Sequence, residues 1–249
     1  MMINLVYCEL SHHGVKGMKW GIRKDRKTVS EFSAYRQSTK TIKQNKDGSY
    51  TIPRGYTYNR VGGTTMQANK SGGLYVSSGK DDAARYVRNL GPSIIGKLLN
   101  EAHTTVQHIE VNKPMKMASE KQTISLLSKA VKNDPKVYKE FNDSLYAYAF
   151  VDGKKPSDKR LAFAVSAMLG NNEHASANKH ILDYCRKNGY DAIPDLNDIY
   201  TGTGTTSTIV LNSSKCTVKE TTYITKDVYK AGKKYAKSLG KLPVDDVIK

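Results

Sequence analysis

Cysteine is scarce in this sequence. The 249 residues include three cysteines, Cys8, Cys185 and Cys216, and no Cys-x-x-Cys pair. Such a set forms no disulfide framework and does not supply the paired thiolates of a structural zinc site. We therefore expect a protein without disulfides that is synthesised in a reducing cytoplasm.

Long apolar segments are also missing. No stretch approaches the ~18–20 apolar residues that a membrane-spanning helix needs. Residues 1–8 are apolar, but they are too few for the hydrophobic core of a signal peptide, and no basic segment precedes them. We expect neither a membrane partner nor secretion by that route.

Acidic residues are few beside the basic ones. Lys and Arg total 40 against 23 Asp and Glu, which gives a net charge of +17. Such a charge attracts nucleic acid, acidic proteins or anionic membrane surfaces, and it also keeps a protein in solution. The basic residues are densest in residues 16–43 and 226–241. We interpret the first segment as an arm that could contact phosphates. We interpret the second as an ordinary solvent-exposed helix face.

The remaining composition is that of a folded domain, with 38% hydrophobic and 25% charged residues. Short segments rich in aromatic and β-branched residues precede and follow a central region with helical periodicity. The predicted strands cover residues 49–52, 56–61, 73–77, 105–111, 190–193, 207–211 and 216–221. This order predicts an α+β fold.

Apolar residues recur at helical spacing in the central region, which predicts a block of amphipathic helices. The stripes cover residues 124–131, 137–148, 161–169 and 177–185. Pro135 and Pro156 separate helices, and Gly189 ends the last one. We expect three parts in the chain: a basic arm and connector (1–46), an α+β domain that begins at the Asp47-Gly48 turn (47–224), and a C-terminal basic helix and tail (225–249).

The N-terminal residues differ from the rest of the chain. Glycines at 14, 17 and 21 disfavour a helix there, and the sole tryptophan, Trp20, has the character of an anchor in an extended peptide. Two adjacent histidines make only a weak metal site, and we expect no metal here. The residues predicted to bind a partner are His12, His13, Lys16, Met18, Lys19, Trp20 and Arg23.

The segment His12–Lys24 resembles a peptide tag that recurs in tailed-bacteriophage proteins of the head-morphogenesis region. This resemblance implies a virion protein, synthesised in the cytoplasm of the bacterial host and associated with the phage head. It implies phage head or portal proteins as partners, and packaged DNA as a polyanion nearby.

Residues 49–222 are similar in their order of elements to ADP-ribosyltransferase domains. The similarity rests on an arginine-bearing early strand, then Tyr75-Val76-Ser77-Ser78 before a helix, a helical block and a late hairpin. It implies a split sheet with a helical block, and NAD as the cofactor. Arg60 or Arg54 would contact the NAD phosphates, Ser77 would belong to the nicotinamide-ribose pocket, and Tyr75 would add an aromatic ring to the cleft wall.

The sequence departs from that family at the catalytic acid. A glutamate is expected just before the late strand, where this chain has Thr206-Ser207-Thr208. Asp195 or Asp198, in the preceding loop, are the candidate replacements.

Three hypotheses about function follow from the sequence. The first is a head-associated structural protein with a degenerate transferase-like domain. The second is an active NAD-dependent protein ADP-ribosyltransferase that is packaged in the capsid and delivered to the host, and the third is a nucleic-acid-binding phage protein.

Overall fold

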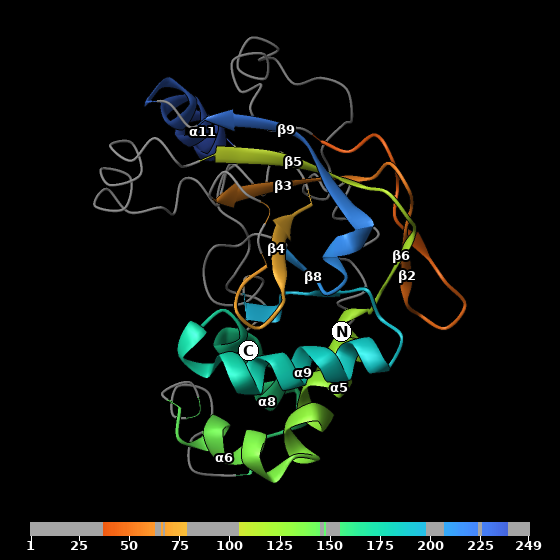
Figure 1. Cartoon of the computed structure of the whole chain (residues 1–249), viewed down its shortest axis with the longest axis vertical. Helices are drawn as coiled ribbons and strands as arrows, with labels where there is room; N and C mark the ends of the chain where they lie inside the picture. The colour runs from red at the N-terminus through yellow and green to blue at the C-terminus, as the bar shows by residue number, and fades with distance from the viewer. Residues whose placement is uncertain are drawn as a thin grey trace.

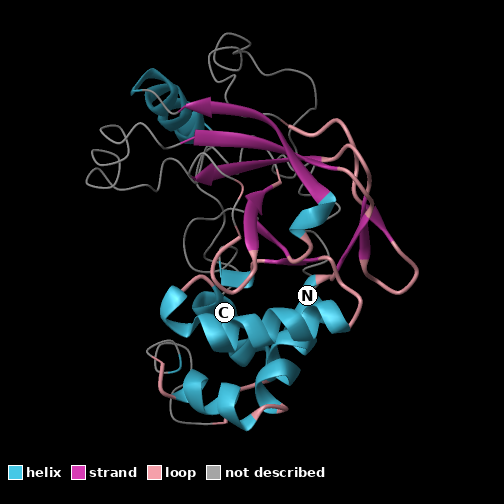
Figure 2. Ribbon diagram, in the orientation of Figure 1, coloured by secondary structure: helices cyan, strands magenta, loops and turns pink. Residues whose placement is uncertain are grey.

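The computed structural model describes residues 37–62, 66, 68–78, 105–144, 147, 155–197, 207–223 and 226–238. Over these ranges the chain forms an α+β fold, as the sequence predicted. It has a nine-stranded sheet, and helices lie at the two ends of the molecule (Figure 2). The predicted partner-binding residues of the arm, from His12 to Arg23, lie outside the described residues, as does Asp198.

The strands follow one another along the chain in a different order from their order in the sheet. They are β1 (Lys43–Gln44), β2 (Tyr50–Ile52), β3 (Thr57–Gly62), β4 (Leu74–Ser77), β5 (Thr105–Val111), β6 (Met115–Met117), β7 (Ala192–Pro194), β8 (Ser207–Val210) and β9 (Cys216–Tyr223). The sheet order is β1-β2-β6-β7-β8-β4-β3-β5-β9. The pairing of β6 with β7 is parallel, and the other pairings are antiparallel.

The helices confirm the predicted helical block. They are α5 (Glu120–Lys132), α6 (Pro135–Asn142), α8 (Asp158–Leu169), α9 (Ala175–Lys187) and α11 (Lys226–Ser238). Local signals set their starts: Ser119 and Gln122 form a capping box at α5, and Pro135 occupies the first turn of α6. Figure 1 shows α5, α6, α8 and α9 together at one end of the molecule, and α11 at the other end beside β9.

The sheet is nearly divided between β3 and β4. These two strands share a single residue pair, Asn59 with Ser77. β3 pairs with β5 from Thr57 to Gly62, and β4 pairs with β8 over its whole length. In Figure 1, β3, β5 and β9 run across the direction of β4. The two parts of the sheet therefore diverge from one point of contact, which leaves space beside it.

Each face of the sheet has its own apolar core. Ile193 and Ile209 point to the face on which α5, α8 and α9 pack, and they join the buried residues of those helices. The opposite face carries a core of strand residues that includes Tyr58, Leu74 and Ile109. Alternation along each strand produces this separation, because successive side chains point to opposite faces.

The sheet begins earlier than the sequence predicted. β1 starts at Lys43 and pairs with β2, so the fold extends ahead of the boundary expected at residue 47. Ile42, within the predicted connector, is buried against the strand core. None of the described helices is long and apolar enough to cross a membrane.

Two of the three cysteines lie inside the fold, and we expect them to be unreactive. Burial raises the pKa of the Cys185 thiol to about 12 and that of Cys216 to about 11. Since the thiolate is the nucleophile, iodoacetamide at pH 8 should alkylate both at least about 100-fold more slowly in the native protein than in urea. Peptide mass spectrometry after timed quenching measures this ratio. Equal rates in the two conditions would show that these thiols are accessible.

Candidate functional site

A cavity of about 480 Å³ lies at the split between β3 and β4. Its walls come from β3, β4, the loop before β4, the C-terminal half of α8, and the residues next to β7 and β8. They are Asn59, Arg60, Val61, Ala68, Asn69, Gly73, Tyr75, Val76, Ser77, Ser166, Ala167, Gly170, Asp195, Asn197 and Ser207. Four residues predicted from the sequence, Arg60, Tyr75, Ser77 and Asp195, meet in this cavity.

A row of buried polar side chains crosses the sheet at the cavity. Asn59 on β3 lies opposite Ser77 on β4, and Ser77 lies opposite Ser207 on β8. The next residue in the row is Asp195, whose N–H donates to the Ser207 carbonyl at 2.9 Å. Directly opposed residues point to the same face of a sheet. The register of these strands therefore places the polar groups on one cavity wall.

The same row continues away from the cavity through β5 and β9. Asn59 lies opposite His108, and His108 lies opposite Glu220. His108 is buried, and its Nδ1 is 3.4 Å from Glu220 Oε2, an ion-pair distance longer than an ordinary hydrogen bond. His108 does not line the cavity. It lies beside Asn59 on the same face of the sheet.

Asp195 supplies the one carboxylate among the described lining residues. The side chain is buried, and its Oδ1 accepts hydrogen bonds from Ser166 Oγ at 2.9 Å and from the Asn197 N–H at 3.1 Å. The Asn197 N–H also lies 3.2 Å from Ser166 Oγ. Ser166 belongs to α8, so that helix helps to set the orientation of the carboxylate. The other candidate acid, Asp198, cannot be placed beside it, because it lies outside the described residues.

Arg60, in the last part of β3, is one of the residues that line the cavity. Its Nη1 donates to Gln107 Oε1 at 2.9 Å, and Gln107 is buried on the neighbouring strand β5. This bond holds the guanidinium beside β5. A planar fork of N–H donors suits a phosphate, which it can contact through two parallel bonds.

Arg54, the alternative phosphate-binding residue, lies elsewhere. It is exposed in the turn between β2 and β3, next to Gly55, whose positive φ of 81° shapes that turn. It does not line the cavity. Of the two candidate arginines, the fold therefore brings only Arg60 to the cavity.

The loop before β4 closes another side of the cavity, and Asn69 organises it. Asn69 Oδ1 accepts from Ser71 Oγ at 2.6 Å and from the Gly73 N–H at 2.9 Å, while its Nδ2 donates to the Leu169 carbonyl at 3.3 Å. These bonds tie the loop to itself and to the end of α8. Asn69 and Ser166 were missed by sequence reasoning, although the segment Asn-Lys-Ser-Gly-Gly at residues 69–73 is a recognisable turn signal.

The cavity is lined mainly by polar residues, among them one arginine and one aspartate. Its described walls carry one guanidinium, one carboxylate, serine hydroxyls and an aromatic ring, but no lysine, histidine or cysteine. Within the described ranges, no three or more His, Cys, Asp or Glu side chains are grouped as a metal ion would need. The carboxylate can act as a general base or stabilise positive charge, and the guanidinium can hold a phosphate.

Comparison with known proteins gives one match, at the N-terminus. A family described as "Family of unknown function (DUF7211)" matches residues 4–27. Those residues contain the tag-like segment and lie outside the described part of the chain. No curated protein and no solved structure matches the sequence. The match therefore concerns the N-terminal segment, and the cavity stands on its own geometry.

Proposed function

We propose that the folded domain has an ADP-ribosyltransferase-like architecture and binds an NAD-type dinucleotide in the cavity between β3 and β4. The observation that carries this proposal is the convergence of Arg60, Tyr75, Ser77 and Asp195 on one cavity. The sequence alone predicts each of these residues as part of a site. They come from two strands, β3 and β4, and from the residue that follows β7, so sequence proximity does not explain why these three segments meet.

The shape of the cavity supports a dinucleotide ligand. A volume of about 480 Å³ is within the range of about 300–1,000 Å³ that small-molecule sites span. Arg60 stands at the end of the cavity that β3 forms and would hold the phosphates. Ser77 and Tyr75 on β4 would face the ribose and the nicotinamide ring. The split of the sheet between β3 and β4 provides the space for such a ligand.

The residues favour binding over efficient transfer. The resemblance leads one to expect a glutamate within residues 206–208, and of these Ser207 lies opposite Ser77 in the cavity wall. A serine hydroxyl carries no negative charge, and the loss of one such stabilising group costs about 10²–10³ in rate. We therefore propose a degenerate transferase-like domain that retains its dinucleotide.

An active transferase is the second candidate, and Asp195 is the observation that favours it. Its carboxylate lines the cavity next to Ser207 and is held by Ser166 and the Asn197 N–H. A carboxylate in this position could replace the missing glutamate. Transfer of ADP-ribose to host proteins would then depend on Asp195.

The virion context rests on the N-terminal segment. We propose that this protein is associated with a tailed-phage head and that residues 12–24 bind a head or portal protein. The tag resemblance supports this, and the family match at residues 4–27 adds that the same segment recurs in other chains. The net charge of +17 is compatible with a place near packaged DNA.

Isothermal titration calorimetry of NAD into full-length variants tests the proposed ligand. Arg60→Ala should weaken NAD binding by about 10–100-fold, because a hydrogen-bonded charge contact contributes about 1.5–3 kcal/mol. Arg54→Ala is the matched control: it removes the same charge from an exposed turn outside the cavity and should leave the affinity unchanged.

Equal affinities in the two arginine variants, or no NAD binding by the wild type, would refute the dinucleotide site. Incubation with labelled NAD and host lysate then separates the two candidate functions. Label on proteins that disappears with Asp195→Asn supports an active transferase. Binding without transfer supports the degenerate domain.

A further inference from the structure

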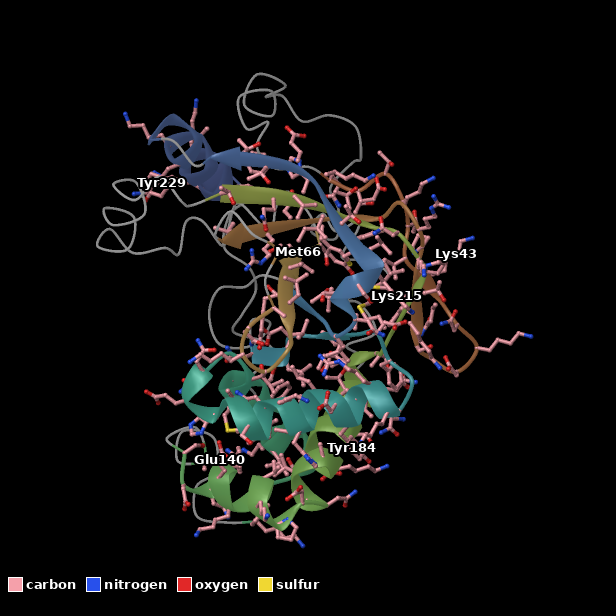
Figure 3. All side chains as sticks on the ribbon, viewed as in Figure 1. Lys43, Met66, Glu140, Tyr184, Lys215 and Tyr229 are labelled. Atoms are coloured by element: carbon pink, nitrogen blue, oxygen red, sulfur yellow. The ribbon has the colours of Figure 1, made fainter. Side chains whose placement is uncertain are left out.

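The C-terminal helix α11 presents one strongly basic side to solvent. Lys230, Lys233 and Lys237 are exposed, and their i, i+3, i+7 spacing places them on one side of the helix. Gly232 and Tyr235, on the opposite side, are buried. Figure 3 shows nitrogen-tipped side chains that project from α11 near Tyr229, away from the sheet. The helix is therefore anchored by one side, and its lysines form an ordered row on the other.

Little within the described fold neutralises this row. The helix holds five lysines and one acidic residue, Asp227. Among the described residues, no carboxylate forms an ion pair with Lys230, Lys233 or Lys237. By contrast, Lys132 and Lys179 on the helices at the other end of the molecule pair with Asp158 and Asp183. The charge of the α11 row is therefore available to a partner.

We propose that this lysine row of α11 binds the phosphate backbone of double-stranded DNA. Three and four residues of helix span about 4.5 and 6 Å, so the three lysines form a nearly straight line about 10 Å long. Duplex DNA carries one negative charge per ~1.7 Å, and each lysine that replaces a condensed counterion adds to affinity. Such a contact reads no sequence, because it engages only phosphates.

Two other polyanionic surfaces fit the helix less well. An amphipathic helix binds a membrane by inserting its apolar side, but here that side packs against the protein through Tyr235, which is 4% exposed. Single-stranded nucleic acid is usually held by aromatic side chains that stack on bases. The exposed residues described on the lysine side include no aromatic ring, since Tyr229 is half-buried. Duplex DNA, which needs only phosphate contacts, fits best.

The salt dependence of DNA binding by the full chain tests this surface. The variant Lys230→Gln/Lys233→Gln/Lys237→Gln removes three positive charges from α11. The matched control Lys121→Gln/Lys136→Gln/Lys139→Gln removes three exposed charges from α5 and α6. Both keep residues 16–43, so any DNA contact of that basic segment cancels in the comparison. Fluorescence anisotropy with a labelled 20-base-pair duplex gives the affinity between 50 and 200 mM NaCl.

The α11 variant should reduce the slope of log K against log salt by about 2.7, since each phosphate contact contributes about 0.9. Over that salt range the wild type would then lose about 40 times more affinity than the variant. The control should keep the wild-type slope. Circular dichroism confirms that both variants fold.

The proposal is wrong if the α11 variant keeps the wild-type slope, or if the control lowers the slope equally through net charge alone. Poly-L-glutamate and vesicles containing phosphatidylserine are the competing probes. Loss of binding to either of these in the α11 variant, with an unchanged DNA slope, would assign the row to an acidic protein or to a membrane instead. NAD takes no part in these measurements, so they leave the dinucleotide site untouched.

Discussion

The Arg186→Ala variant is expected to unfold about 6–12 °C below the wild type. The Arg186 guanidinium donates to the Leu211 carbonyl at 3.0 Å, to the Gly72 carbonyl at 2.7 Å and to Asp183. Its loss leaves two carbonyls of partly buried segments without this donor, a cost of about 3 kcal/mol. In a chain of this size, 1 kcal/mol corresponds to about 2–4 °C. Thermal melts followed by circular dichroism measure the change.

The position of Arg186 explains the size of this effect. From α9 it reaches the end of β8 and the loop before β4, so it connects the helical block to the sheet and to a loop that lines the cavity. Lys187→Ala is the control: Lys187 is exposed in the same turn, and its truncation should change the unfolding temperature by no more than about 2 °C. Similar melting temperatures for the two variants would show that the Arg186 bonds add little to stability.

Helices were more predictable than strands in this fold, for a physical reason. An amphipathic helix repeats its apolar stripe over several turns, and α5, α8 and α9 are long enough to show that repeat. β1 and β6 have two and three residues, too few to show an alternation. β6 is a strand because β2 and β7 flank it in the sheet. That information lies in distant parts of the chain.

The residues of the candidate site were likewise only partly predictable from the sequence. Arg60 and Ser77 could be nominated from the resemblance, since its motifs name residue types in a fixed order. Asp195 could be nominated only as a carboxylate in the loop before the late strand. Ser166 could not, because it sits within an apolar helical stripe and only the packing of α8 brings its hydroxyl to Asp195. The choice between Arg54 and Arg60 likewise depended on the place where β3 leaves β4, which is a property of the strand register.

Placing a glutamate at residue 207 should turn a binding site into a catalyst. Ser207 is buried in the cavity wall opposite Ser77 and belongs to residues 206–208, where the transferase resemblance leads one to expect the acid. The carboxylate of Ser207→Glu would face the nicotinamide ribose and stabilise the positive charge that develops as nicotinamide leaves. If the proposed function holds, we expect NAD hydrolysis to rise by about 100-fold or more over the wild type. Nicotinamide release, followed by chromatography, gives the rate.

Charge and size can be separated at this position. The glutamine of Ser207→Gln has nearly the same volume as the glutamate of Ser207→Glu but carries no negative charge. This variant should therefore bind NAD and hydrolyse it no faster than the wild type. Asp195 lies next to residue 207, and two neighbouring carboxylates disfavour ionisation of both. Adding Asp195→Asn to Ser207→Glu should therefore keep or increase the gained rate.

If instead this second substitution abolishes the gain, Asp195 is itself the acid, and the domain is an enzyme that works with an aspartate in place of the glutamate. If the Glu and Gln variants both bind NAD and show equal background rates, residue 207 does not face the reacting ribose, and the ligand lies differently in the cavity.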